Sequence, residues 1–210
     1  MKELRPDSAE TQRLLEEVGD PQSEAFSLLF ARHRPYLRRV ISLRLDPRLR
    51  PRVDASDIIQ ETQLEALRRL QDFLKREPMS FRLWLRKIAC ERLLMARRQH
   101  LTANRRSVAR EEPLADASSA ALTRHFLAPG STPSHQLSRH ELVEQVRQAI
   151  ARLAQTDREI VVMRNLELLT NHEVAQILGI DPAAASQRYG RALLKLRKLL
   201  TERGLAEVEL

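Results

Sequence analysis

The clearest helical pattern in the chain runs over residues 81–100, which read FRLWLRKIACERLLMARRQH. Its apolar side chains recur at the three- and four-residue spacing of one helix face, at Leu85, Ile88, Ala89, Leu93 and Ala96. Ser80 precedes the run, where its hydroxyl is expected to cap the first free amides. The other face carries six cations and one acid, which are Arg82, Arg86, Lys87, Arg92, Arg97, Arg98 and Glu91.

Two interpretations of this helix remain open from the stretch alone. Cationic side chains beside a large aromatic, here Trp84, suit a phosphate backbone with exposed bases next to it. Alternatively, the basic face is merely solvated, and Trp84, the only tryptophan, is a core residue.

The composition favours a helical protein with a polyanionic partner. With 210 residues, of which 42% are hydrophobic and 30% charged, the chain suits one or two small domains. Aromatics make up only 4% and there are five glycines, so long strands and glycine turns are not expected. The net charge of +8 is local, because residues 81–110 contain nine Arg or Lys and a single acid.

Several classes of protein are disfavoured. The single cysteine, Cys90, cannot form an internal disulfide, which fits a reducing compartment. The first residues lack an apolar signal core and no run reaches membrane-spanning length, so we expect no membrane insertion. The six histidines show no HExxH spacing, and no GxxxxGK[ST] or GxGxxG occurs. We therefore expect no enzyme activity, no metal and no cofactor.

The first half of the chain predicts a helical domain over residues 23–108. Residues 1–22 are an N-terminal extension with a short amphipathic piece around Leu14, Leu15 and Val18. A helix then begins at Ser23, and its apolar stripe comprises Phe26, Leu29, Phe30, His33, Leu37, Val40 and Ile41. A second helix begins near Asp54 or Ser56, with an inward face of Ile58, Ile59, Leu64, Leu67, Leu70 and Leu74.

The second half predicts a linker, a second helical domain and a tail. Residues 109–138 are rich in Ala, Ser, Pro and Thr and are interpreted as the linker, although 120–127 can form a short helix. Residues 139–203 form the second domain, and 204–210 the tail after an expected C-cap at Gly204. Three capping boxes mark helix starts, at Ser138–Glu141, Thr156–Glu159 and Thr170–Glu173.

The last two helices of this domain are typical of a helix-turn-helix. They are joined by LGID, in which Gly179 ends one helix and Asp181-Pro182 begins the next. Polar and basic side chains of the last helix would face a major groove and its phosphates, namely Ser186, Gln187, Arg188, Arg191 and Lys195. The alternative is a helical hairpin with a solubilising basic face. Gly190, in the middle of this helix, fits close approach to DNA or to a neighbouring helix.

Three stretches in order along the chain carry a resemblance to a known family. They are DASDIIQETQLEAL at 54–67, FRLWLRKIA at 81–89 and DREIVVMRNLELLTNHEVAQILGIDPAAASQRYGRALLKLRKLL at 157–200. Together they resemble an extracytoplasmic-function sigma factor of bacterial RNA polymerase. The resemblance covers about residues 23–106 and 139–203, the family's regions two and four, and implies an all-α fold of two helical domains.

The resemblance also implies partners and contact residues. Asp57, Gln60 and Glu61 occupy the Asp-x-x-Gln-Glu pattern that in the family grips the clamp of the largest subunit of core RNA polymerase. Contacts to the minus-ten promoter element would come from Trp84, Arg86, Lys87, Arg92, Arg97 and Arg98. The residues of the last helix would bind the minus-thirty-five element of promoter DNA. An anti-sigma factor is a further partner, and the expected location is the cytoplasm, with the nucleoid.

The chain departs from the family at two places. Glu91 and Met95 stand where the family usually has Asn and Asp, and Ala185 and Ser186 where it has Val and a cation. The base preferences of relatives therefore do not transfer to this chain. The alternative function is a stand-alone helix-turn-helix regulator that binds duplex DNA through residues 139–203 alone.

Overall fold

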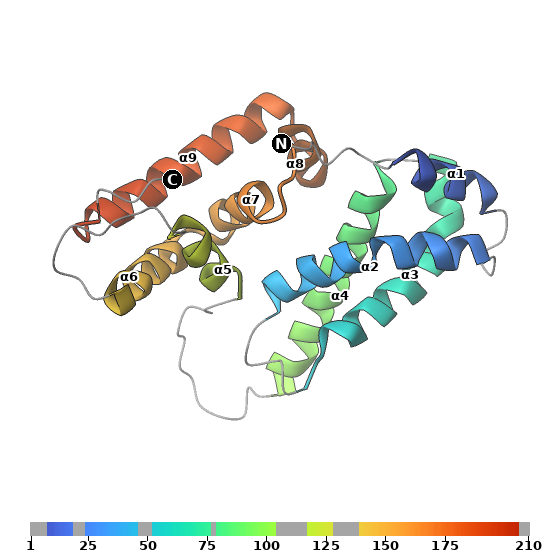
Figure 1. Ribbon diagram of the computed structural model, residues 1–210, viewed down its shortest axis with the longest axis horizontal. Coiled ribbons are helices and arrows are strands. Elements are labelled where there is room, and N and C mark those ends of the chain that lie inside the picture. Colours follow the sequence, from blue (N-terminus) through green and yellow to red (C-terminus); the bar gives the residue numbers. More distant parts are fainter. Residues whose placement is uncertain are drawn as a thin grey trace. The chain divides into compact units, whose positions relative to one another are not determined.

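The structure is a computed structural model that describes residues 8–18, 24–45, 52–76, 79–103, 117–127 and 139–205 (Figure 1). Within these ranges every regular element is an α-helix, which confirms the predicted all-α class. The chain divides into two compact units, Met1–Arg110 and Glu111–Leu210.

The first unit is built on three helices that pack against one another, α2 (Glu24–Arg44), α3 (Ala55–Arg76) and α4 (Phe81–Ala103). All seven residues of the stripe predicted for α2 are buried, so that prediction is confirmed. On α3 the prediction is wrong for Leu64, which is 58% exposed. Its place in the core is taken by Thr62 and Ala66, and the Thr62 hydroxyl is satisfied by donating to the Ile58 carbonyl at 2.6 Å.

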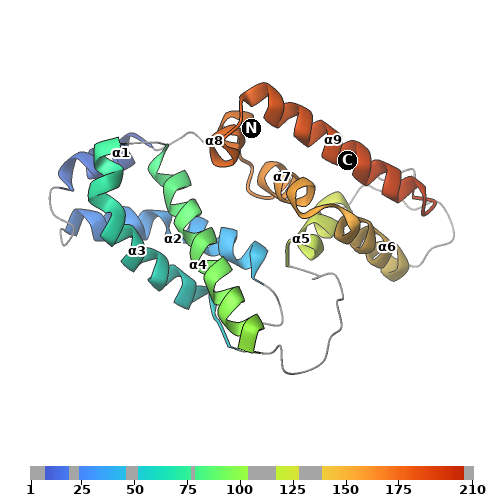
Figure 2. The ribbon, with the colours of Figure 1, turned by 180° about the vertical axis from the view of Figure 1, so that it is seen from behind.

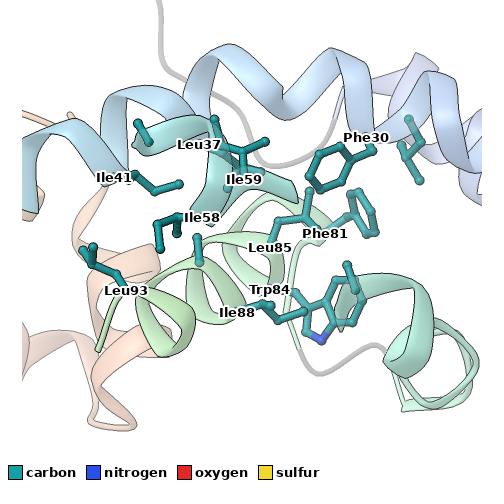
Figure 3. Packing of buried hydrophobic residues seen from close by; sticks show 14 of the residues in the cluster. Phe30, Leu37, Ile41, Ile58, Ile59, Phe81, Trp84, Leu85, Ile88 and Leu93 are labelled. Carbon is teal, nitrogen blue, oxygen red and sulfur yellow. The ribbon is translucent and has the colours of Figure 1, made fainter. Parts of the chain in front are cut away.

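The core of this unit lies between the three helices. Figure 3 shows Leu37 and Ile41 of α2, Ile58 of α3 and Leu85 of α4 converging there, and all four are at most 1% exposed. Burying each such side chain stabilises the fold by about 1.5–3 kcal/mol. The apolar stripe predicted for α4 faces inward, since its members Leu85, Ile88, Ala89, Leu93 and Ala96 are all buried.

The described part of the N-terminal extension, residues 8–18, packs on this unit. Its amphipathic piece forms α1 (Ala9–Glu17), which packs on α2. Thr11 is buried, with its Oγ1 3.4 Å from Nε2 of His33. Val18, 3% exposed, joins the core at the end of the helix.

The second unit contains α5 (Ala117–Phe126), α6 (Arg139–Arg152), α7 (Gln155–Asn165), α8 (Asn171–Leu178) and α9 (Pro182–Thr201). The long helix α9 lies along α6, α7 and α8 (Figure 2). Small and apolar residues recur on its inner face, and Ala185, Ala192, Leu196 and Leu200 are buried there.

Helix α5 lies inside the segment 109–138 that the sequence assigned to the linker. It packs on α6 and α7 and buries Ser118, Ser119, Leu122 and Thr123. Arg158 of α7 reaches it, with its Nη1 donating to Ser119 Oγ at 3.3 Å. The buried face consists mostly of small and hydroxyl-bearing residues, so it lacks the apolar periodicity that marks a helix in sequence.

The predicted helix caps have different outcomes. The box at Thr170–Glu173 is present, whereas α7 begins two residues early, with Ala154 at the N-cap in place of Thr156. The Ser80 hydroxyl is buried without a hydrogen-bond partner, and its carbonyl instead accepts from Trp84 N at 3.0 Å. Ser138 lies outside the described residues.

Candidate nucleic-acid interface

The pair α8–α9 has the geometry of a helix-turn-helix. Thr170 Oγ1 accepts from Glu173 N at 3.2 Å and the Glu173 carboxylate accepts from Thr170 N at 2.7 Å, so the start of α8 is fixed. Gly179 ends the helix in the left-handed conformation, at φ 64°. Asp181 then caps α9 by accepting from Ala184 N at 2.8 Å, with Pro182 in the first turn.

A side-chain contact also joins the two helices at their N-terminal ends. Asn171 Nδ2 donates to the Pro182 carbonyl at 2.6 Å and so links the first residue of α8 to the first of α9. Asn171 was not among the residues predicted from the sequence. Its contact partner is a backbone carbonyl eleven residues away, so no side-chain spacing indicates it.

The first turns of α9 present the polar side chains that the sequence predicted. Ser186, Gln187 and Arg188 are all exposed. Arg191, one turn later, is also exposed, and its Nη2 donates to Gln187 Oε1 at 3.3 Å. These four donors and acceptors lie where a helix that enters a major groove contacts bases and phosphates.

Lys195, the fifth residue of this predicted set, is engaged within the protein. Its Nζ lies 2.6 Å from Oδ2 of Asp157, a carboxylate that is only 11% exposed, on α7. The pair ties the C-terminal half of α9 to α7. A second tie runs from the Tyr189 hydroxyl to Asn165 Oδ1 at 3.2 Å, with Arg164 stacked over the Tyr189 ring. Lys195 therefore orients α9 in this structure.

The basic face of α4 is smaller than the sequence predicted. Lys87 and Arg98 are exposed and Arg97 is partly exposed. Arg86 is only 3% exposed, and Arg82, at 7%, lies over the Tyr36 ring at 5.1 Å. These two arginines are thus buried in the unit, where the long aliphatic part of each side chain can pack.

Trp84 also belongs to the interior. It is 8% exposed, and its ring centroid lies 4.5 Å from that of Phe73 and 5.4 Å from that of Phe81 (Figure 3). The contact of Trp84 with a promoter base stays a prediction, which the packing of the indole on both neighbouring rings does not favour. Trp84 is a core residue, which was the alternative interpretation.

Glu91, the acid that interrupts the basic face, is paired across the helix interface. Arg69 of α3 donates from Nη1 to Glu91 Oε2 at 2.8 Å and from Nε to Glu65 Oε1 at 2.6 Å. Arg92 lies 3.9 Å from Glu65 Oε2. Arg69 and Glu65 were missed in the sequence analysis, although their four-residue spacing is the signal of a helical ion pair.

This ion-pair network shifts two pKa values. Burial alone would raise the pKa of Glu65, but the hydrogen bond from Arg69 and the charges of Arg69, Arg92 and Arg68 hold it below 4.5. Burial would lower the pKa of Arg69, and the hydrogen bonds to Glu91 and Glu65 raise it instead. The Glu65 carboxylate is thus stabilised as an anion by neighbouring guanidinium groups.

The predicted polymerase-binding residues share one exposed face of α3. Asp57, Gln60 and Glu61 are exposed, and Leu64 continues the same face one turn later. Asp57 also has a local role, because its Oδ2 accepts from Asp54 N at 3.0 Å at the start of the helix. An exposed leucine beside carboxylates and an amide is suited to a protein surface as partner.

The described part of the chain holds no group of three or more His, Cys, Asp or Glu side chains arranged to bind a metal ion. None of its helices combines the length and the apolar character needed to cross a membrane.

Two family models match the chain, one over each unit. The model for sigma-70 region 2 matches residues 29–102, and the model for sigma-70 region 4 matches residues 143–196. The first match begins within α2, includes α3 and ends within α4, and the second includes α8 and most of α9.

Similar proteins carry related names. The RNA polymerase sigma factor CarQ of Myxococcus xanthus is 31% identical over 191 residues, which are 90% of this chain and 96% of the relative. The ECF RNA polymerase sigma-E factor of Haemophilus influenzae is 28% identical over 182 residues, 86% of this chain and 90% of the relative.

Two solved structures share the fold. CnrH, determined in complex with the cytosolic domain of CnrY, aligns with a TM-score of 0.53 at 22% identity, covering 92% of this chain and 96% of that one. The sigma factor RpoE of Bartonella quintana, determined with the anti-sigma factor NepR, aligns with a TM-score of 0.51 at 19% identity, covering 85% and 98%.

Proposed function

The chain belongs to the extracytoplasmic-function sigma factors, and from this premise we propose how its two units direct RNA polymerase to promoters. In this proposal the polymerase catalyses RNA synthesis, and the sigma factor binds core polymerase and recognises promoter DNA at the same time. The observation that supports the proposal is that one chain exposes a polar face on α3, at Asp57, Gln60 and Glu61, and another on α9, at Ser186, Gln187 and Arg188.

The face of α3 docks on core polymerase. Asp57, Gln60 and Glu61 supply two carboxylates and an amide on one side of the helix, with Leu64 as the apolar contact beside them. Because these side chains are exposed, they can meet a partner without rearrangement of the core behind them. The partner surface would offer arginine or lysine to the carboxylates and an apolar contact to Leu64.

The DNA-binding roles divide between the units. Ser186, Gln187, Arg188 and Arg191 of α9 read the minus-thirty-five element, and Lys195 supports them by holding α9 against α7. Lys87, Arg97 and Arg98 of α4 follow the phosphates of the minus-ten element. Such a factor works on the chromosome, so we place it with the nucleoid in the cytoplasm.

Docking is tested by changing the α3 face without disturbing its cap. Reversing the charge of Asp57 would remove the carboxylate that accepts from Asp54 N, and loss of a cap costs about 0.5–2 kcal/mol. We therefore choose Asp57→Asn, which keeps an acceptor, together with Gln60→Arg and Glu61→Arg. The triple variant should keep its thermal unfolding midpoint and lose co-elution with core polymerase. Unchanged co-elution would refute docking through this face.

Comparing DNA binding and transcription with and without core polymerase distinguishes a stand-alone regulator from a sigma factor. A regulator that uses only residues 139–203 would bind duplex promoter DNA equally well with and without polymerase. The sigma factor should give a promoter-specific transcript from a genomic fragment only when both core polymerase and the full chain are present. A transcript that does not require the chain would contradict the proposal.

We also propose that an anti-sigma factor regulates the chain. Support comes from the two solved relatives, which were determined in complex with the cytosolic domain of CnrY and with the anti-sigma factor NepR. Capture of the tagged chain from native cells under conditions of low activity should co-purify a protein that is displaced when core polymerase is added.

A further inference from the structure

Asn171 forms a hydrogen bond that reaches from the first helix of the helix-turn-helix into the first turn of the second. Its Nδ2 donates to the Pro182 carbonyl at 2.6 Å, across eleven residues of chain. In an α-helix a carbonyl also accepts from the amide four residues later, which for Pro182 is the amide of Ser186. A carbonyl oxygen has two lone pairs and can serve both donors. Asn171 thus holds the same carbonyl that supports the backbone of Ser186.

The apolar packing at this end of α9 is small. The side chain that the first turn buries is Ala185, and a single methyl group gives little resistance to sliding of one helix along another. Asp181 caps the same turn, but its carboxylate accepts from a backbone amide of α9 itself and does not reach α8 in that contact. The directional bond from Asn171 therefore fixes the start of α9 on α8 more firmly than the packing does.

Two further hydrogen bonds hold α9 in its later turns. The Tyr189 hydroxyl donates to Asn165 Oδ1 at 3.2 Å, and Lys195 Nζ donates to Asp157 Oδ2 at 2.6 Å, both on α7. They lie about two and four turns beyond Pro182. The start of α9 is thus tied to α8 and its later turns to α7, and the side chains proposed to read bases begin between the first two ties.

Positioning of α9 matters more for base contacts than for phosphate contacts. In a helix-turn-helix the first helix crosses the DNA backbone, and the N-terminal residues of the second meet base edges. Phosphate contacts set the register of the protein on the duplex but carry no sequence information, whereas base contacts require each donor to meet its acceptor. A bond between the two helices therefore transfers the register set on the backbone to the side chains that read bases.

We propose that Asn171 is a positioning residue for promoter discrimination. It holds the first turn of α9 on α8, so that the side chains of Ser186, Gln187 and Arg188 meet their base pairs in one register, and it acts through α9 without touching a base. The inference rests on the proposed function, because it assigns a task to Asn171 within recognition of the minus-thirty-five element.

The test uses holoenzyme assembled from core polymerase and the full chain. The probe is a genomic duplex fragment that wild-type holoenzyme transcribes, with its minus-thirty-five element randomised, and sequencing of the bound and unbound fractions gives the base preference at each position. Asn171→Ala removes the donor without lowering helix propensity, and Asn171→Gln keeps an amide donor. His172→Ala, at the exposed next residue of α8, is the matched control for loss of a polar side chain at this helix start.

Asn171→Ala should lower the preference for the best sequence over the average one by about two- to tenfold, the effect of one hydrogen bond, while affinity for the average sequence stays at the wild-type level. Its thermal unfolding midpoint should change no more than that of His172→Ala. Asn171→Gln and His172→Ala should both keep the wild-type preference.

Four outcomes overturn the positioning role. They are an unchanged base preference in Asn171→Ala, an equal loss of affinity for every sequence, an equal loss of preference in His172→Ala, and a loss in Asn171→Gln as large as in Asn171→Ala. The second would mean that Asn171 supports the fold or a phosphate contact, and the last that the donated hydrogen bond is not responsible. If wild-type holoenzyme itself shows no base preference in the randomised pool, the proposed function fails rather than the role of Asn171.

Discussion

Arg69 of α3 and Glu91 of α4 form an ion pair across the interface of the two helices, with Arg69 Nη1 2.8 Å from Glu91 Oε2. The pair explains how the basic face of α4, which we propose to follow DNA phosphates, accommodates an acid. Arg69 donates hydrogen bonds to the carboxylates of both Glu91 and Glu65, so its positive charge offsets part of their negative charge. The electrostatic potential at the basic face of α4 therefore depends on side chains of both α3 and α4.

Replacing Arg69 should weaken DNA binding because the negative charge of Glu91 is then no longer paired. In Arg69→Ala, Glu91 loses its partner and repels the phosphates, so holoenzyme affinity for promoter DNA should fall about two- to fivefold, the effect of up to about 1 kcal/mol. The double variant with Glu91→Gln should recover most of the loss. Affinity is measured by fluorescence anisotropy at several salt concentrations.

The matched control for this variant is Arg68→Ala. Arg68 is a 75%-exposed arginine that lies 3.5 Å from Glu65, with no contact to Glu91 among the ion pairs of the described residues. An equal loss of affinity in Arg68→Ala would show that total charge, and not the pairing of Glu91, is responsible.

The network should also make stability depend on pH in the acid range. The pKa of Glu65 is lowered below 4.5 in the folded protein, so its contribution to the free energy of unfolding is fully present above 4.5 and is lost as the pH falls through the folded pKa. Urea unfolding of wild type and Glu65→Gln should differ most near neutral pH and converge in acid. A difference that grows as the pH falls would contradict the assigned sign.

Trp84 provides a direct spectroscopic test of its place in the core. It is the only tryptophan, so fluorescence excited at a wavelength that the two tyrosines do not absorb reports on it alone. With the indole enclosed by Phe73 and Phe81, emission should be blue-shifted and unchanged when promoter DNA is added to the isolated chain. Strong quenching by DNA would instead indicate stacking on a base. Trp84→Ala should cost about 3–5 kcal/mol of stability.

Trp84 and Lys195 illustrate what the sequence could and could not predict. The three- and four-residue periodicity identified the stripe of α2 and the inward face of α4, because burial of one face dictates it. No comparable periodicity tells whether a basic or aromatic residue is buried in the protein or contacts a partner. The side chain of Lys195 looks the same in sequence whether it meets a phosphate or Asp157, thirty-eight residues away. The α5 helix was missed as a packed element for a related reason, since its buried face is made of Ser, Thr and Ala with only a few large apolar groups.

Arg188 and Lys195 should respond differently to alanine substitution. Arg188 is exposed in the second turn of α9, so Arg188→Ala should weaken binding to minus-thirty-five DNA and lower the slope of log affinity against log salt by about 1, without loss of stability. Lys195→Ala breaks the tie to Asp157 and should lower the free energy of unfolding by up to about 1 kcal/mol. Thermal unfolding and salt-dependent anisotropy on both variants check this. If Lys195→Ala also lowers the slope of log affinity against log salt by about 1, Lys195 contacts a DNA phosphate after all.

Gly190 lies in the middle of α9, where glycine costs about 1 kcal/mol relative to alanine. A Cβ added there would meet no atom within 4 Å, so close packing with a neighbouring helix of the described chain does not explain the glycine. Gly190→Ala should therefore stabilise the chain by about 1 kcal/mol in urea unfolding. Gly179→Ala is the contrasting variant, because φ +64° strains any other residue there and should destabilise by a similar amount. If the backbone at Gly190 approaches DNA, Gly190→Ala will gain stability yet bind minus-thirty-five DNA less tightly than wild type. Unchanged binding would leave the glycine without a role at the DNA and remove the last open alternative for this position.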